Sequence, residues 1–387
     1  MGKLNAFLIT LNNPHLVYFA GQTIDGYVTV ELNDAMKMRG VRLQFLGHAR
    51  VHWTETHQTG SGKNRRTETR HYSSSETYFN FELLLFGPGN DSTHLQAGHH
   101  TYPFSFLLPP NLPSSYESHI GNVRYSLKAK IDKPWKFDHK TQKMFTVVSM
   151  LDLNQQPSAT VAVQGENEKN LCCLCCKSGP IHALFRVDRA GYVPGDTIYL
   201  NAEISNHSTR RMKASRVRLI MTTVYHATTK SRTERKDVAM VNKGEISPGG
   251  SVTWSGEPMV VPAVPPSYLV GCSIIDIRYI LQLEVDPAGP GFDLEVPLEV
   301  IVGTIPLRQV VQQYYPMPQP TLSPPSAPPL SQPAGASAPF NLPPPSYAEC
   351  VFGKVGVRED EDSDHMGGDV DFAPSYAYYD WSKSNVR

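Results

Sequence analysis

Hydrophobic and polar residues alternate along several short segments of the chain before Pro306, and this is the pattern of strands that bury one face. The segments with the plainest alternation are rich in β-branched and aromatic residues: 24–32, 41–45, 123–131 and 277–285. Gly, Pro, Asn and Asp recur between them as turn-forming residues. No window carries an apolar repeat of helical period that is long enough for a substantial helix. The pattern predicts an all-β fold.

The sequence also repeats itself, at a spacing of roughly 150 to 180 residues. Tyr18–Ile24 recurs as Tyr192–Ile198, with Tyr, Gly, Thr and Ile at equivalent positions. Two further matches follow in the same order: Val41–Leu43 with Val217–Leu219, and Leu108–Pro110 plus Val123–Leu127 with Val261–Ala263 plus Ile277–Leu281. Each copy is long enough to bury its own core. We therefore predict two tandem immunoglobulin-like β-sandwiches, at 1–150 and 181–306, joined by a connection at 151–180.

Net charge and hydropathy narrow the class of protein. The chain has 387 residues, and its 36 Lys+Arg are balanced by 36 Asp+Glu, so it lacks the basic excess that is typical of nucleic-acid-binding proteins. No apolar run approaches the roughly 18 residues that a membrane-spanning helix needs, and the N-terminus has no signal-peptide pattern. Four of the six cysteines are clustered, which favours a reducing compartment over a disulfide framework. These features predict a cytoplasmic protein that binds no nucleic acid.

Proline marks a change of character after Pro306. Thirteen of the 32 prolines fall between Pro306 and Pro345, and no charged residue except Arg308 occurs from there to Ala348. A segment of this composition has few backbone donors and little to bury. An acidic run at 359–364 follows it. We expect 307–387 to be a disordered tail that packs on neither sandwich.

Pro344-Pro345-Ser346-Tyr347 in this tail matches the PPxY pattern that WW domains bind. Its prolines preset a polyproline II conformation, so little entropy is lost when the peptide docks in an aromatic groove, and its tyrosine adds a flat apolar ring with a hydroxyl. A degenerate second copy, Pro374-Ser375-Tyr376, follows Ala373 where the first copy has a proline, and we expect it to bind weakly at best. Proline is dense enough here for composition alone to generate such a pattern.

Cys172, Cys173, Cys175 and Cys176 form two overlapping C-x2-C pairs, a spacing that suits zinc. One short peptide can hardly wrap four ligands around a metal, so no metal site is predicted. S-acylation is a second interpretation, which would attach the chain peripherally to a membrane. A third is a strand between the domains whose cysteines serve as small hydrophobic residues. The sequence leaves these interpretations open and predicts no cofactor.

Basic residues gather in two expected loops. These are Lys63, Arg65, Arg66 and Arg70 in the first loop, and Lys230, Arg232, Arg235 and Lys236 in the second. Each loop can attract phosphorylated peptides or anionic lipid, and solvated surface charge is the alternative interpretation. No phosphate-binding Gly-rich loop, metalloprotease, hydrolase or kinase signature occurs, so no catalytic residue is predicted and we expect a protein that is not an enzyme.

The two halves resemble the arrestin fold. The resemblance rests on these segments: Val261–Tyr279, Tyr18–Gln22, Phe104–Pro110, and the Cys-rich stretch that runs into Lys177–Ile181. It covers residues 1–306, and the PPxY tail makes the chain similar to the α-arrestin, or arrestin-domain-containing, branch. Members of that branch recruit HECT-type ubiquitin ligases through such motifs. The resemblance implies an adaptor that brings a ligase to the cytoplasmic regions of receptors or transporters at the plasma membrane and endosomes, and so promotes their endocytosis and lysosomal sorting.

Pro325-Ser326-Ala327-Pro328 matches the P-[ST]-A-P pattern that the ESCRT-I sorting complex binds. If it is used, the chain would connect a ubiquitin ligase with endosomal sorting. A run rich in Pro, Ser and Ala also generates this tetrapeptide easily by chance. The chain departs from the two-motif pattern common in α-arrestins, because its second PPxY copy is degenerate.

Two other relatives of the fold suggest different functions. One α-arrestin branch binds thioredoxin through cysteine chemistry, but here the segment before Trp254 has no cysteine, and Cys272 lies in a strand-like context. Retromer subunits with an arrestin-like fold sort cargo within a coat and need no PPxY motif. The tail therefore favours the adaptor over the redox regulator and the coat component.

Overall fold

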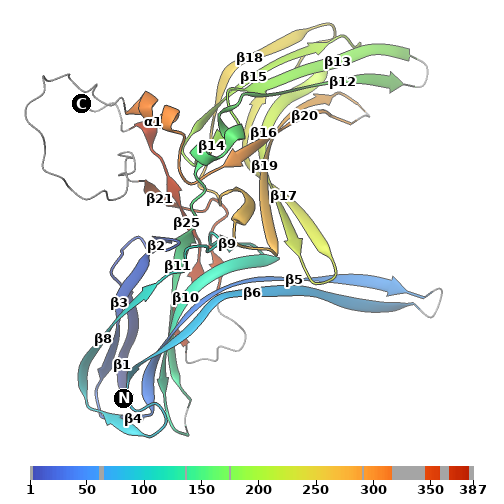
Figure 1. Cartoon of the computed structure of the whole chain (residues 1–387). Coiled ribbons are helices and arrows are strands. Elements are labelled where there is room, and N and C mark those ends of the chain that lie inside the picture. The colour runs from blue at the N-terminus through green and yellow to red at the C-terminus, as the bar shows by residue number, and fades with distance from the viewer. Residues whose placement is uncertain are drawn as a thin grey trace, which may run out of the picture.

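Two β-sandwiches follow one another along the chain, and the last described segments lie between them (Figure 1). The computed structural model describes residues 3–60, 65–135, 137–173, 176–289, 292–315, 345–357 and 366–382. The predicted all-β class and the two tandem sandwiches are confirmed. Among the described residues, no helix is long and apolar enough to cross a membrane.

The N-terminal sandwich pairs a three-stranded sheet, in the order β1-β3-β8, with a larger sheet, in the order β2-β11-β10-β5-β6. Its strands are β1 (Leu4–Leu11), β2 (Val17–Phe19), β3 (Thr23–Leu32), β4 (Met36–Met38), β5 (Gly40–Thr59), β6 (Arg66–Phe86), β7 (Thr93–Leu95), β8 (Gly98–Leu107), β9 (Tyr116–Glu117), β10 (Gly121–Asp132) and β11 (His139–Val148). In β3, Ile24, Val28 and Val30 are buried at alternate positions, because a strand with one face on the core buries every second side chain.

The C-terminal sandwich pairs a four-stranded sheet, in the order β12-β13-β15-β18, with a five-stranded sheet, in the order β14-β20-β19-β16-β17. Its strands are β12 (Val163–Cys173), β13 (Cys176–Val187), β14 (Gly191–Tyr192), β15 (Thr197–Asn206), β16 (Met212–His226), β17 (Ser231–Lys243), β18 (Ser251–Val260), β19 (Ile275–Pro287) and β20 (Leu294–Val302). A short 3-10 helix, η4 (Ser267–Leu269), precedes β19.

The internal repeat appears as a repeated topology. In each sandwich a short strand pairs in parallel with a long one, β2 with β11 and β14 with β20, and three long antiparallel strands follow across the sheet. Tyr125 and Tyr279 lie at matching positions of the repeat, and both are fully buried. The hydroxyl of Tyr125 donates to the carbonyl oxygen of Pro113 at 2.7 Å, and that of Tyr279 donates to Pro265 at 2.7 Å. The second half is thus a structural copy of the first.

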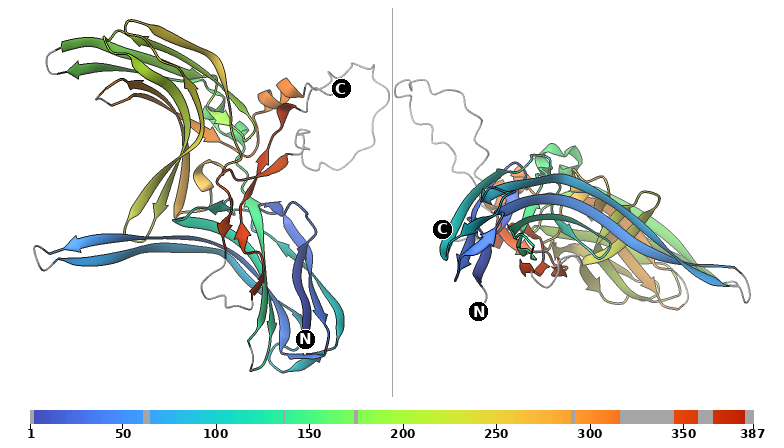
Figure 2. Two further views of the ribbon diagram at one scale, coloured as in Figure 1. Left: turned by 180° about the vertical axis from the view of Figure 1, so that it is seen from behind. Right: turned by 90° about the horizontal axis from the view of Figure 1, so that it is seen from below.

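The surface between the two sandwiches, which we call the domain seam, is held by polar contacts. The hydroxyls of Tyr116 and Tyr225 are 2.7 Å apart, and Tyr225 also donates to the Ser118 hydroxyl at 2.9 Å. Farther out, β5 and β6 continue as a long hairpin that projects from the N-terminal sandwich (Figure 2). There Lys230 of the C-terminal sandwich pairs with Glu55 at 2.6 Å. These contacts join residues far apart in the sequence.

The connection between the sandwiches is shorter than the predicted 151–180. It contains two 3-10 helices, η2 (Leu153–Gln155) and η3 (Pro157–Thr160). β12 then begins at Val163 as the edge strand of the four-stranded sheet and pairs with β13. Its residues 164–170 are mostly exposed and polar, so the strand lacks the apolar alternation that would have predicted it.

The expectation of a disordered 307–387 needs correction for its described parts. A helix, α1 (Arg308–Tyr314), follows the second sandwich. Five short strands come after it: β21 (Ser346–Glu349), β22 (Val355–Gly356), β23 (Met366–Gly368), β24 (Asp371–Phe372) and β25 (Ser375–Tyr378). β21 pairs with β25, β22 with β24, and β23 runs parallel to β11 of the N-terminal sandwich. The physical reason is that the chain after the proline-rich run carries aromatic residues, and these bury apolar surface against the sandwiches.

Candidate functional site

The two copies of Pro-Ser-Tyr-Ala, at 345–348 and 374–377, pair with each other. β21 and β25 form a two-stranded antiparallel sheet, which we call the motif sheet. The paired residues are Ser346 with Tyr378, Tyr347 with Ala377, Ala348 with Tyr376, and Glu349 with Ser375. This register is symmetric, because each tyrosine lies opposite the alanine of the other copy. The motif sheet therefore holds Ser346 and Tyr347 of the predicted WW-binding motif beside Ser375 and Tyr376 of the degenerate copy.

Tyr347, the tyrosine of the PPxY motif, is half-buried on one face of the motif sheet. Its ring lies 5.5 Å from that of His15, and it packs on an apolar cluster that includes Ala377 and Tyr379. Burial raises the pKa of the Tyr347 hydroxyl. The neighbouring Ser346 is exposed and donates a hydrogen bond to the carbonyl oxygen of Tyr378 at 2.9 Å. Pro345 is described, whereas Pro344 lies outside the described residues.

Tyr376, the tyrosine of the degenerate copy, lies on the opposite face and is only 3% exposed. Its hydroxyl donates to the carbonyl oxygen of Ser115 in the N-terminal sandwich at 2.9 Å. The amide of Ser375 donates to the Thr146 hydroxyl at 3.0 Å, and Pro374 is buried. Burial raises the pKa of Tyr376 well above its ordinary value. The predicted weak ligand is therefore an anchor in the domain seam.

Two further aromatic residues fix the chain after β25 to the C-terminal sandwich. Tyr379 donates its amide to Pro194 at 3.0 Å and its hydroxyl to the carbonyl oxygen of Thr304 at 2.9 Å. Trp381 donates its indole N–H to Asp196 at 2.8 Å and stacks on Tyr379, with ring centroids 5.6 Å apart. We call Tyr376, Tyr379 and Trp381 the C-terminal anchor. Because Tyr376 bonds to one sandwich and the other two bond to the second, the anchor bridges both.

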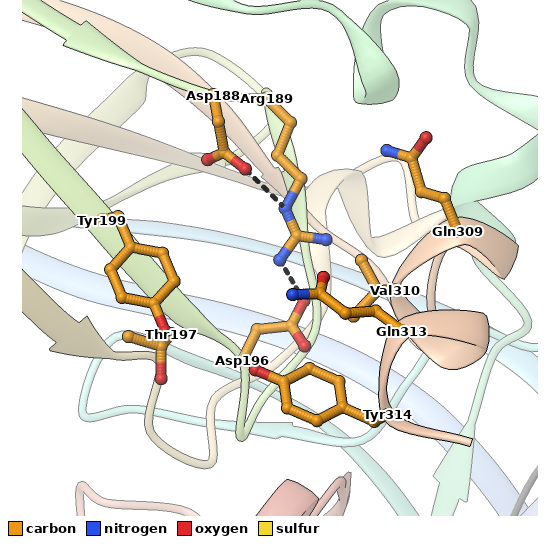
Figure 3. Close-up of a pocket in the computed structure, with 9 residues that line it drawn as sticks. All are labelled: Asp188, Arg189, Asp196, Thr197, Tyr199, Gln309, Val310, Gln313 and Tyr314. Carbon is orange, nitrogen blue, oxygen red and sulfur yellow. Dashed lines mark hydrogen bonds and ion pairs between the residues drawn. The ribbon is translucent and has the colours of Figure 1, made fainter. Parts of the chain in front are cut away.

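Asp196, which accepts the hydrogen bond from Trp381, also lines a pocket of about 210 Å³. Figure 3 shows this pocket, with residues of α1 lining one side of it. The other carboxylate oxygen of Asp196 accepts from Arg189 at 3.2 Å and from the amide of Val193 at 3.2 Å. The Arg189 guanidinium lies 4.6 Å from the ring of Tyr192. Burial raises the pKa of Asp196, and the Arg189 charge opposes that rise. The rings of Tyr314 in α1 and Trp381 are stacked, with centroids 4.9 Å apart. The helix and the C-terminal anchor therefore pack on each other beside the pocket.

The described residues between the two copies also contact the sandwiches. The carboxylate of Asp369 accepts from the Met144 amide at 2.8 Å and from Lys143 at 3.3 Å, beside the β23–β11 pair. The Cys350 amide donates to Pro374 at 2.8 Å. Phe352 lies beneath the Lys236 ammonium, 3.6 Å from ring centroid to nitrogen. These hydrogen bonds, the Lys143–Asp369 ion pair and the cation–π contact all join segments of one chain.

The structure places the remaining predicted motifs elsewhere. Pro325-Ser326-Ala327-Pro328 lies outside the described residues, and so does Cys175. Cys172, Cys173 and Cys176 lie where β12 and β13 meet, with Cys173 opposite Cys176 in the register. The cluster is thus on a hairpin of the C-terminal sandwich, far from the motif sheet (Figure 1). In the described part of the chain, no group of His, Cys, Asp and Glu has a metal-holding arrangement.

The basic clusters are engaged within the chain where the structure describes them. Lys230 pairs with Glu55, Arg232 with Glu234 at 3.4 Å, and Lys236 with the Phe352 ring. In the first cluster, Arg70 pairs with Glu68 at 3.3 Å, and Arg65 and Arg66 are exposed; Lys63 lies outside the described residues. These pairs favour structural and solvated charge over a preformed anion site.

Cys272, the cysteine weighed for redox chemistry, is partly buried, and burial raises its pKa. A raised thiol pKa reduces the thiolate fraction and with it the reactivity.

Tyr379, Trp381 and Asp369 were not predicted as site residues from the sequence. A signal for the first two was present, because Tyr376–Trp381 contains four aromatic residues in six positions, a density unlike that of a solvated tail. Asp369 carried no such signal, since its role depends on the unpaired edge of β11, which only the fold supplies.

Comparisons with known proteins agree with the two sandwiches. The family model described as arrestin (or S-antigen), N-terminal domain, matches residues 7–154, and the corresponding C-terminal domain model matches 177–307. Arrestin domain-containing protein 17 of Caenorhabditis elegans is 35% identical over 327 residues, which cover 79% of this chain and 72% of that protein. Arrestin domain-containing protein 4 of Mus musculus is 33% identical over 75% of this chain and 69% of its own. Arrestin domain-containing protein 1 of Homo sapiens is 30% identical over 86% and 72%.

Proposed function

The chain belongs to the arrestin family, in its arrestin-domain-containing branch, and from this we propose that it is an adaptor which links membrane-protein cargo to HECT-type ubiquitin ligases that carry WW domains. The sandwiches bind the cytoplasmic region of a receptor or transporter, and the PPxY motif binds the ligase. The cargo is then ubiquitinated, internalised and sorted through endosomes toward lysosomes. The protein acts by binding and not by catalysis.

The observation that carries this proposal is Pro344-Pro345-Ser346-Tyr347 attached to a pair of arrestin domains. Two prolines followed at the proper distance by tyrosine provide the preset conformation and the flat ring that a WW groove binds. The mechanism is proximity: tethering the ligase beside the cargo replaces a bimolecular encounter with an intramolecular one, at an effective concentration set by the connecting chain. Lysines of the cargo near the bound adaptor then become the substrates.

Two further motifs extend the proposal. Pro325-Ser326-Ala327-Pro328 would bind ESCRT-I and pass ubiquitinated cargo to the endosomal sorting machinery. Acylation of Cys172, Cys173, Cys175 and Cys176 would hold the adaptor peripherally on the membrane that carries its cargo. The hairpin position of this cluster, at the junction of β12 and β13, supports acylation over a connection between domains.

A titration of the tail peptide 338–387 against WW domains of a HECT ligase tests the ligase contact. We expect a dissociation constant in the micromolar range, about −8 kcal/mol, for the wild-type peptide. Tyr347→Ala should remove binding, because it deletes the ring that enters the groove. Tyr376→Ala is the matched control and should leave binding unchanged, because Ala373 replaces the first proline of that copy. Equal binding by the wild-type and Tyr347→Ala peptides would overturn the proposal.

A further inference from the structure

The pairing of the two Pro-Ser-Tyr-Ala copies has a consequence for the ligase motif. We propose that the second copy is an intramolecular partner which withholds the first: a WW domain reaches Tyr347 only after β21 has separated from β25. The inference rests on the proposed function, because it concerns access to the same motif. It assigns the degenerate copy a role that does not require any WW domain to bind it.

The paired state and the WW-bound state need different surroundings for the same residues. A WW groove takes a polyproline II peptide with an exposed tyrosine ring and no strand neighbour. In the structure, residues 346–349 are instead paired with 375–378, and the Ser346 hydroxyl bonds to Tyr378. Tyr347 is half-buried between His15 and the cluster that includes Tyr379. A WW domain cannot enclose this ring while these contacts hold.

The two strands are held with unequal strength. β25 continues into the C-terminal anchor, where Tyr376, Tyr379 and Trp381 each have a hydrogen bond to a sandwich and are at most 8% exposed. In β21, Ser346 and Glu349 are exposed, and Tyr347 and Ala348 are only partly buried. Separation therefore costs the four β21 pairs and the Tyr347 contacts, and it leaves the anchor in place. The strand that separates is β21, which holds Ser346 and Tyr347 of the copy with both prolines.

The sequence of the second copy agrees with a firmly held β25 and a more weakly held β21. Ala373 replaces the proline that a WW ligand needs, while Pro374 and Tyr376 are buried in the domain seam. The second copy thus lacks the first proline that a WW ligand needs, and its tyrosine forms contacts within the protein. Gly195 of the C-terminal sandwich fits the same arrangement, because a Cβ there would collide with the carbonyl oxygen of Tyr379.

The experiment measures binding of one WW domain to the whole chain and to variants that close or open the motif sheet. Ser346 and Tyr378 are directly opposite, so S346C/Y378C places two cysteines within the usual span of a disulfide. Ser346 is the variable position of PPxY, and S346C alone is the matched control. A chain ending at Ala373 removes β25 and the anchor. Thermal melting of each variant establishes that both sandwiches are folded.

If pairing withholds the motif, the chain ending at Ala373 binds at least about tenfold more tightly than the whole chain, since apparent affinity falls with the fraction of open molecules. The oxidised double variant shows no binding, and reduction restores it, whereas S346C binds equally under both conditions. Equal binding by the oxidised and reduced double variant would overturn the inference while the proposed function stands. Failure of the chain ending at Ala373 to bind would instead overturn the proposed function, and this inference with it.

Discussion

Tyr347 and Tyr376 occupy the same position in two copies of one short sequence, yet their side chains lie on opposite faces of the motif sheet. Tyr347 is opposite Ala377 and Tyr376 is opposite Ala348, and adjacent pairs in an antiparallel sheet point to opposite sides. One tyrosine therefore lies half-exposed beside His15, and the other is buried against Ser115. The same sequence thus leaves its tyrosine half-exposed in one copy and buries it as an anchor in the other.

The hydroxyl of Tyr376 should contribute measurably to stability. Tyr376→Phe keeps the ring and removes the bond to the Ser115 carbonyl, so we expect the free energy of unfolding to fall by about 1 kcal/mol, as for a typical buried hydrogen bond. Tyr378→Phe is the control, because Tyr378 is less buried. Urea unfolding of both variants measures the difference. A loss no larger for Tyr376→Phe than for Tyr378→Phe would contradict the anchor role.

A pair of glycine substitutions separates backbone strain from loss of the tail contact. Gly21 and Gly195 are equivalent in the repeat and have φ of +86° and +97°, so Gly→Ala should cost about 1 kcal/mol or more at each. At Gly21 the nearest atom to a new Cβ is 3.8 Å away, whereas at Gly195 the Cβ would meet Tyr379. Hydrogen exchange at 375–382 should therefore rise in Gly195→Ala and stay unchanged in Gly21→Ala. Equal exchange in the two variants would show that the Tyr379 contact is unimportant.

The alkylation rate of Cys350 shows whether the segment after β21 is packed against the residues around Pro374. Burial raises the pKa of its thiol to about 11, so roughly one molecule in ten thousand carries the thiolate at pH 7. Alkylation at pH 7 should be slow. Below that pKa, its rate should rise about tenfold for each unit by which the pH is raised, because the thiolate fraction rises by that factor. In the chain ending at Ala373 the pKa should fall toward the ordinary value, and alkylation at pH 7 should be faster by about two orders of magnitude. Peptide mapping by mass spectrometry distinguishes Cys350 from the other cysteines; an unchanged rate would mean that β25 does not contribute to its burial.

The Tyr116–Tyr225 contact should stabilise the domain seam. Tyr225→Phe removes the hydrogen bonds to Tyr116 and Ser118 while keeping the ring, and we expect a loss of about 1 to 2 kcal/mol. Tyr27→Phe, at a more exposed position of β3, is the control. Denaturant unfolding followed by fluorescence measures both. A Tyr225→Phe protein as stable as the wild type would show that these bonds merely replace bonds to water.

The sequence was sufficient for the body of the fold. Alternation in segments such as 24–32 predicted strands, and the repeat of Tyr18–Ile24 as Tyr192–Ile198 predicted the duplication that the topology shows. It was insufficient for β12, an exposed edge strand without an apolar face. Alternation detects a strand only where apolar side chains fill its inner face, so an edge strand with polar residues and glycine on that face leaves little pattern.

The site was predicted only in part, for a different reason. The expectation of disorder was drawn from the composition of the proline-rich run and was extended to all of 307–387. Tyr376, Tyr379 and Trp381 bury their rings against surfaces that are formed by residues such as Ser115 and Thr304, more than 70 positions away in the sequence. Local composition contains no information about a surface that only the assembled sandwiches create.

The aromatic cluster around Trp381 also determines what a break in the chain would do. The described chain stops at Tyr315 and resumes at Pro345, and both Tyr314 and Tyr347 pack on that one cluster. A protease that cut between them would therefore not release the C-terminal piece, which would stay bound to the two sandwiches without a covalent link. The nicked protein would migrate as two fragments under denaturing conditions and as one particle under native conditions, with Tyr347 on the fragment that does not carry the two sandwiches.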